Sequence, residues 1–280
     1  MRGTRGQRAG LAAFALLSLG SRALCAEPVV LDVRAESGLL GRSFRYTDPI
    51  ADHRPDLAAR RPPDNVVPAA ATFRLRLESY PLAALTRAWP ALIGLHLDLS
   101  GSLPTSVRGG PGEPTLGSQT LGQAQVGAQV RLDWGRIELV PRAAWGLHGS
   151  YLHWTDPAAP LFPDVTYSYL EFGARLRAHL DGLTLEGRLG VRPLLSLGAV
   201  ASPQWFPRAT GIGMVAGASA GWAFHPSLSL LVNLDFTQYG LAFHPDPTAP
   251  PERYVGGAND QSVAVTLGLC WRLPSPARAR

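Results

Sequence analysis

The chain has 280 residues, of which 46% are hydrophobic and 17% charged, and its formal net charge is +5 at pH 7. No apolar run reaches the roughly 20 residues that a membrane-spanning helix needs, which excludes a helical membrane protein. A membrane β-barrel is not excluded, because alternating strands average to near-neutral hydropathy. The mean hydropathy here is +0.03.

The first residues carry the three parts of a secretory signal. Arg2, Arg5 and Arg8 precede a short apolar stretch, LAAFALLSL, and small residues follow up to Ala26. We therefore expect a cleavable signal peptide at residues 1–26, with an N-terminal anchor or buried core helix as the alternative. Removing this segment takes away four arginines and no acid, so the net charge falls to +1 (5 − 4). The basic composition then gives no case for a nucleic-acid partner.

Cysteine and histidine usage argues against a metal or another cofactor. Cleavage after Ala26 leaves Cys270 as the sole cysteine, which excludes an intramolecular disulfide and a thiolate metal cluster. Lipid attachment at Cys25 is not expected, because Leu24 stands where a lipoprotein signal has a small residue. The seven histidines show no His-x-x-x-His or His-x-x-Glu spacing.

Alternation of apolar and polar residues is the main signal in the rest of the chain. At residues 72–80, Leu75 and Leu77 fall on one face of a strand, and Arg74 and Arg76 fall on the other. Together with a less regular segment at 29–47, the pattern predicts ten strands, an even number as in single-chain bacterial barrels. The further alternating segments are 95–100, 123–133, 136–148, 170–181, 183–192, 212–222, 228–237 and 263–271.

The first segment changes its pattern midway. Leu31 and Val33 occupy odd positions, whereas Phe44 and Tyr46 occupy even ones. A bulge near residues 38–41 would switch the face while keeping one long strand. A tight hairpin there would change the strand count and separate the two termini. The bulge is the favoured interpretation.

Long and short connections alternate along the chain. Short turns are predicted at residues 134–135, 181–182 and 225–227, and the longer connection from Pro81 to Pro90 is interpreted as a turn with a helical cap. Outer-membrane barrels have short periplasmic turns and long external loops, so we expect both termini in the periplasm. The long, Pro- and Gly-rich loops expected outside are 48–70, 103–119, 152–164, 199–210 and 243–259.

Aromatic residues gather near both ends of the expected strands, as in the two interfacial girdles of membrane barrels. A soluble lipocalin-like barrel is the alternative, but it would need neither an export signal nor two aromatic bands. The expected band at the short-turn ends contains Tyr80, Trp89, Trp134, Trp222, Phe224 and Trp271. The band at the long-loop ends contains Phe44, Tyr46, Phe73, Tyr151, Trp154, Tyr167, Tyr169, Phe236, Tyr239 and Phe243.

Residues 27–273 resemble the superfamily of small bacterial outer-membrane β-barrels over essentially their whole length. The expected fold is all-β: an antiparallel up-and-down transmembrane β-barrel of about ten strands. The last strand (SVAVTLGLCWRL) resembles the terminal strand that the barrel-assembly machinery recognises, although here residues 274–280 follow as a tail after Trp271. The resemblance implies an outer-membrane location, with membrane lipid and that machinery as partners. It implies no activity, and we expect a monomer.

The polar faces of the strands would line the lumen. Their near balance of charge favours a mutually paired network that fills a narrow bore, because buried charges are tolerated when they are paired. The alternative is a narrow channel whose arginines line a path for anions. The expected lumen residues are Arg74, Arg76, Arg131, Arg142, Arg175, Arg177, Arg188 and Arg192, with Glu78, Asp98, Asp133, Glu138, Glu171, Glu186 and Asp235.

Two features suggest an enzymatic alternative, a lipid or peptide hydrolase. His148 and Ser150 resemble the His-x-Ser arrangement of outer-membrane lipid-A deacylases, with Asp156 or Asp164 nearby as the acid. The alternation, however, points His148 and Ser150 into the lumen, away from lipid.

The second feature involves His96 and Asp98. Ten-strand outer-membrane proteases carry Asp and His residues high on the inner wall, and this pair could form part of such a site. The sequence offers no second acidic pair at a comparable height. We therefore assign no catalytic residues and expect a structural or surface-interaction role carried by the long loops.

Overall fold

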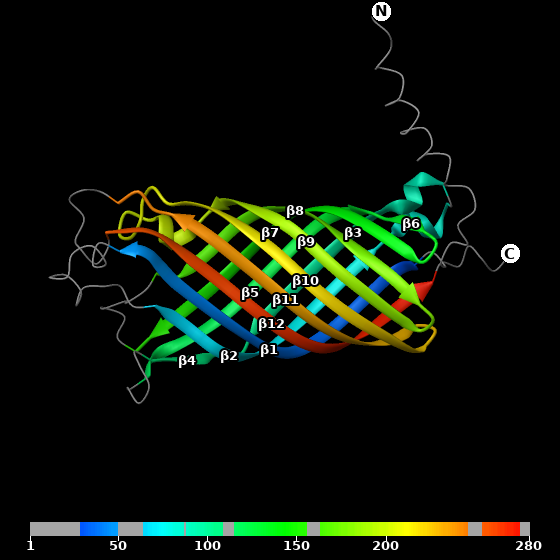
Figure 1. Cartoon of the computed structure of the whole chain (residues 1–280), viewed down its shortest axis with the longest axis horizontal. Helices are drawn as coiled ribbons and strands as arrows, with labels where there is room; N and C mark the ends of the chain where they lie inside the picture. Colours follow the sequence, from blue (N-terminus) through cyan, green and yellow to red (C-terminus); the bar gives the residue numbers. More distant parts are fainter. Residues whose placement is uncertain are drawn as a thin grey trace, which may run out of the picture.

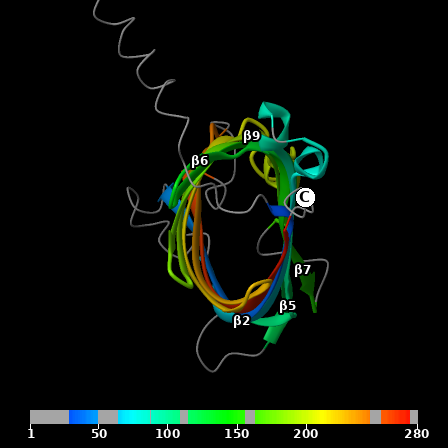
Figure 2. The same ribbon diagram turned by 90° about the vertical axis from the view of Figure 1, so that its right-hand side faces the viewer.

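The strands close into one antiparallel barrel, which is oval when viewed along its axis (Figures 1 and 2). The computed structural model describes residues 29–49, 64–86, 88–108, 115–155, 163–245 and 254–274. The expected signal peptide and residues 275–280 of the expected tail lie outside the described residues.

Ten strand positions form the wall, as predicted, and each pairs with its neighbours in chain order. β4 continues the line of β3, and β6 continues that of β5, while pairing of β1 with β12 closes the ring. The strands are β1 (Val29–Pro49), β2 (Asn65–Ser79), β3 (Ile93–Ser102), β4 (Thr105–Arg108), β5 (Thr115–Val130), β6 (Leu132–Trp134), β7 (Ile137–Trp154), β8 (Val165–Leu180), β9 (Leu183–Ser196), β10 (Thr210–His225), β11 (Leu228–Ala242) and β12 (Val255–Pro274).

β1 is one long strand, as predicted, but the predicted switch of its face is wrong. Even-numbered residues point inward from Asp32 to Tyr46, and Phe44 and Tyr46 are buried inside the barrel. The irregularity lies on the neighbouring strand, where β2 uses one residue more than β1 between the pairs of Leu40 and Arg42. Two residues of β2 oppose one of β1 there, and one of the two is Pro68, which has no N–H to donate to the ladder.

Short connections occupy one end of the barrel, as predicted. Gly135 and Gly182 adopt positive φ values of 66° and 88° in two of these turns, a conformation that glycine adopts at little cost. The longer connection forms two 3-10 helices, Pro81–Ala84 and Trp89–Leu92. Both ends of the described chain lie at this same end, because Val29 pairs with Pro274.

At the opposite end, the ladders continue into segments predicted as loops. β1 reaches Pro49, β4 pairs with the start of β5, and β12 begins at Val255. The alternation ends earlier than the ladders do, because at this end the inward face is itself apolar, as Phe44 and Tyr46 illustrate. Residues 197–209 also differ from an exposed loop, since Val200 and Phe206 are buried in the barrel mouth.

The outer wall is apolar and the interior is charged, the reverse of a lipocalin-like barrel. Leu189 and Leu267 are 70% and 58% exposed on the outside, whereas Arg34 and Glu171 are fully buried inside. A soluble monomer does not expose a continuous apolar wall of this kind. Among the described residues, no helix is long and apolar enough to cross a membrane.

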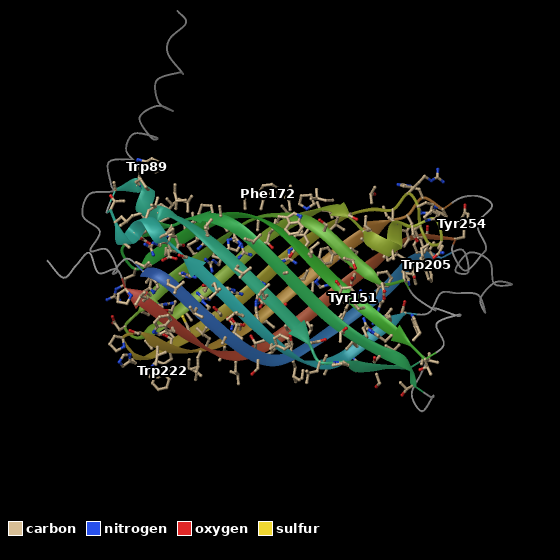
Figure 3. The ribbon with its side chains drawn as sticks, turned by 180° about the vertical axis from the view of Figure 1, so that it is seen from behind. Trp89, Tyr151, Phe172, Trp205, Trp222 and Tyr254 are labelled. Carbon is tan, nitrogen blue, oxygen red and sulfur yellow. The ribbon has the colours of Figure 1, made fainter. Side chains whose placement is uncertain are left out.

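The aromatic bands agree with the prediction for most residues at the short-turn end and for only part of them at the long-loop end. Trp89 and Trp222 stand out from the wall there, with Phe172 near mid-height (Figure 3). Tyr80 is an exception, because it is buried inside. At the long-loop end, Phe73 and Tyr151 are exposed as expected. The band was wrong for the residues that the structure buries in the interior: Phe44, Tyr46, Tyr167, Tyr169, Tyr239 and Phe243.

Candidate functional site

The lumen is the candidate site, and oppositely charged side chains fill most of it. The structure places all fifteen charged residues that the sequence assigned to the lumen on inward-facing positions, with Asp133 and Asp235 half-buried and the others buried. Five buried charges were missed. Four belong to β1, and the fifth lies between the loop predicted at 243–259 and the strand predicted at 263–271, although the even-numbered parity of each strand identifies them. They are Asp32, Arg34, Glu36, Arg42 and Asp260.

Glu78 is the centre of the cluster nearest the short turns. Its Oε2 accepts hydrogen bonds from Nη2 of Arg175 at 2.7 Å and Nη2 of Arg177 at 3.0 Å. β2 carries Glu78 and β8 carries both arginines, and β3, β5 and β7 separate them around the ring. These bonds therefore cross the lumen from wall to wall.

Glu186 of β9 extends the same cluster. Its Oε2 accepts hydrogen bonds from Nε of Arg177 at 2.6 Å and from Nη2 of Arg34 at 3.1 Å. Arg34 belongs to β1, so this pair also spans the bore. Glu138 accepts a hydrogen bond from Arg177 at 2.9 Å. Near the turns, Arg131 lies 3.5 Å from Asp133 and stacks over the ring of Tyr80.

Two aspartates organise the middle of the lumen. Asp98 pairs with Arg74 and lies 3.5 Å from Nε of Arg76. Asp235 of β11 pairs with the same Arg74 and with Nη2 of Arg188 at 2.7 Å. Arg74 thus joins β2, β3 and β11 across the bore.

Above these lies a third cluster around Glu171. It pairs with Arg142 and accepts a hydrogen bond from Nε of Arg192 at 2.8 Å. Arg192 also donates to the hydroxyl of Tyr239 at 2.9 Å and stacks 4.4 Å from the ring centre of Tyr169. The inward tyrosines thus serve the charged network, which explains their absence from the outer girdle.

Asp260 forms the uppermost pair. Both of its carboxylate oxygens accept hydrogen bonds from Arg42 at 2.8 Å, and one also accepts from the hydroxyl of Tyr167 at 3.0 Å. Arg42 and Asp260 are buried. The pair closes the charged part of the lumen on the long-loop side.

An apolar cluster fills the mouth beyond Asp260. The rings of Phe206 and Phe243 stack in parallel with their centres 4.0 Å apart. Residues 197–209 contribute to it from the β9–β10 connection and so cover the mouth from inside. Its buried members are Phe44, Tyr46, Val165, Tyr167, Leu197, Val200, Phe206, Tyr239, Leu241, Phe243, Val255 and Ala258.

Little space remains between these groups. A cavity of about 60 Å³ lies in the middle of the lumen beside Arg74 and Arg188. A wider recess of about 210 Å³ lies at the short-turn end, lined by Tyr80, Arg131 and Glu138 among others. The described part of the chain holds no group of three His, Cys, Asp or Glu residues able to bind a metal ion.

The geometry does not assemble the lipid-A deacylase alternative. Ser150 is fully buried, and its Oγ accepts hydrogen bonds from Arg42 at 3.0 Å and from Gln119. His148 instead stacks on Tyr167 with ring centres 6.0 Å apart. Asp164 accepts from the backbone of Leu152 at 2.8 Å, and residue 156 lies outside the described residues.

The protease alternative also lacks its geometry. Asp98 is engaged by Arg74 and Arg76, and the ring nitrogens of His96 have no hydrogen-bond partner within the described structure. A carboxylate held by two arginines is a poor proton acceptor. His96 and Asp98 therefore share a wall of the lumen without forming an acid–base pair.

No protein-family model and no curated protein matches the sequence. Among solved structures, the barrel is similar to the outer-membrane protease OmpT from Escherichia coli, with 12% identity, a TM-score of 0.50, and coverage of 90% of this chain and 99% of that one. The translocator domain of the autotransporter NalP from Neisseria meningitidis gives 10% identity, a TM-score of 0.38 and 95% coverage of each chain. At this identity the likeness to OmpT shows the fold alone. A closed ten-strand barrel with an apolar outer wall and a charged interior has the architecture of an outer-membrane β-barrel.

Proposed function

We propose that this outer-membrane β-barrel is a non-conducting structural or surface-interaction protein whose lumen is filled by its own side chains. The observation that carries the proposal is the set of ion pairs that join opposite walls, above all Glu78 of β2 with Arg175 and Arg177 of β8. In an open pore, by contrast, charged side chains line a continuous water-filled path. Small barrels have interiors that side chains can fill.

The mouth at the long-loop end supports the same role. Residues 197–209 fold inward, so that Val200 and Phe206 pack on Tyr46 and Phe243 instead of extending into solvent. Hydrated ions would have to cross this apolar layer before they met the charged network of the lumen. An apolar constriction of this kind resists wetting and opposes conduction.

The long connections at that end would make the contacts with a surface partner. Trp205 and Tyr254 lie there, both half-buried (Figure 3). Tyrosine and tryptophan are enriched in protein interfaces, and binding residues are commonly placed on loops held by a rigid scaffold. The cross-lumen network supplies such rigidity to the barrel.

We further propose that the protein is a monomer, with outer-membrane lipid and the barrel-assembly machinery as its partners. The apolar wall would contact lipid, and the exposed ring of Trp271 lies near the short-turn end of β12. That placement is compatible with the terminal-strand signal suggested by the sequence.

Single-channel recording in planar bilayers tests the proposal. The refolded wild-type protein should show no steady conductance under conditions in which an open porin conducts. A steady current with an anion preference, weakened in Arg142→Ala or Arg175→Ala, would replace the proposal with a narrow anion channel.

A further inference from the structure

The cavity in the middle of the lumen has an unusual lining. It lies beside Arg74 of β2, His148 of β7, Arg188 of β9 and Asp235 of β11, with Thr237 and Ser262 adding hydroxyl groups. Its volume is about 60 Å³. The ion pairs made by Asp98 and by Asp235 lie on one side of the cavity. On the other side, His148 lies near the pair of Arg42 and Asp260.

The positive charge of Arg188 is only partly compensated in this lining. Its carboxylate partner, Asp235, also pairs with Arg74, and Arg74 and Arg142 both lie near enough to Arg188 to repel it. Arg74 has Asp98 as a second ion-pair partner, whereas Arg188 has no second one among the described residues. A buried charge is costly unless an opposite charge compensates it.

Arg188 also has hydrogen-bond donors to spare. Its Nη2 binds Asp235 at 2.7 Å, but its Nε and Nη1 have no partner within the described structure, although the residue is only 6% exposed. Nδ1 of His148, which lines the same cavity, is also without a partner there. Leaving buried donors of a charged group unsatisfied is unfavourable, so the free guanidinium donors of Arg188 favour an acceptor beside them.

We propose that this cavity binds a small monovalent inorganic anion of the size of chloride. The size follows from the volume: one water needs about 10–15 Å³, so the cavity holds such an ion and a few waters but no organic anion of any length. The single charge follows from Arg188, because a guanidinium group that already shares the carboxylate of Asp235 with Arg74 would be overcompensated by a dianion. Arg188 is the principal ligand, and Arg74 and Thr237 complete the surroundings.

The first test compares anions at constant ionic strength. The unfolding midpoint of the refolded protein in detergent micelles should rise with chloride or bromide and saturate, and it should not rise with the bulky gluconate ion. Arg188→Met should abolish the difference between the anions. Arg136→Met, at an exposed arginine on a short turn, should retain it. Equal midpoints in chloride and gluconate for the wild-type protein would overturn the proposal.

The second test does not depend on stability. Crystals grown in sodium bromide should show an anomalous scattering peak in the cavity, within hydrogen-bond distance of Arg188, and Asp235→Asn should retain the peak. Density for waters alone, without an anomalous peak, would overturn the anion site. The outcome is separable from the proposed function, because a conducting barrel with bromide at Arg188 would refute the non-conducting role and leave the site in place.

Discussion

The ring of Tyr239 on β11 lies over the Cα atom of Gly213, its direct cross-strand partner on β10. A Cβ atom at Gly213 would be 2.5 Å from Cδ1 of the ring, and the ring cannot retreat without moving its hydroxyl away from Arg192. The glycine therefore gives the tyrosine the room to reach the charged network. Gly146 and Tyr169 on β7 and β8 form the same kind of pair.

Gly213→Ala should therefore destabilise the barrel by about 1–3 kcal/mol, the usual cost of overpacking. Gly240→Ala is the matched control, since a Cβ atom there meets nothing within 4 Å. Urea unfolding of the refolded proteins in detergent, followed by tryptophan fluorescence, measures both. Equal stabilities for the two variants would show that Tyr239 does not need the space above Gly213.

Loss of the Glu78 carboxylate should destabilise the barrel without opening it. Glu78→Ala leaves Arg175 and Arg177 short of a partner, which typically costs about 3–5 kcal/mol when the charges are fully buried and less if water enters the lumen. Asp181→Ala removes an exposed partner of Arg136 at 3.4 Å and should cost about 0–1 kcal/mol. Denaturant titrations give the two costs, and bilayer recordings of Glu78→Ala should stay silent. If Glu78→Ala has the same free energy of unfolding as the wild-type protein, the ion network does not stabilise the barrel.

A charge placed on the outer wall should lower the free energy of unfolding, and the loss should be larger the nearer the charge lies to the bilayer midplane. Leu189→Arg puts a guanidinium group on the exposed face of β9, where the cost near the bilayer midplane is about 2–4 kcal/mol. Leu85→Arg, in the connection between the two 3-10 helices, should cost about 0–1 kcal/mol because it lies near the interface. Refolding into lipid vesicles at increasing urea compares them. If both variants refold equally well, the wall near Leu189 does not face hydrocarbon.

Labelling of intact cells tests the expected orientation. Single cysteines at Thr105, Ala158 or Thr248 should react with a membrane-impermeant maleimide, and cysteines at Gly182 or Ser227 should not. The native Cys270 should add no background, because its side chain is buried. The reverse labelling pattern would show that the barrel has the opposite orientation in the membrane.

Alternation in the sequence was sufficient to predict the ten strands and the inward direction of most charges, because lipid outside and a polar bore inside impose opposite demands on successive residues. The same parity could have placed Tyr167 and Tyr169 inside, since they share odd positions with Glu171 on β8. Their aromatic character favoured a membrane girdle instead. Proximity in sequence to the loops was a poor guide to which face a ring occupies.

The choice of ion partners could not be predicted in this way. Arg34 and Glu186 meet across the bore, although 152 positions separate them in the chain. Which charges meet depends on the register of every intervening strand, and a single extra residue such as that in β2 changes it. The apolar cluster in the mouth could not be predicted from the sequence for a related reason. The inward face there is itself apolar, so the contrast between the two faces of the strands disappears.

The pairing of β1 with β12 also determines when the wall can be completed. This ladder runs from Val29 with Pro274 to Pro49 with Val255, so the first described strand finds its second neighbour only in the last. Until then both strands present open edges, which are prone to pairing with other chains. A chain that loses β12 would retain most of its residues and yet keep two unpaired edges. Closure of the barrel therefore waits on the final twenty residues of the described chain.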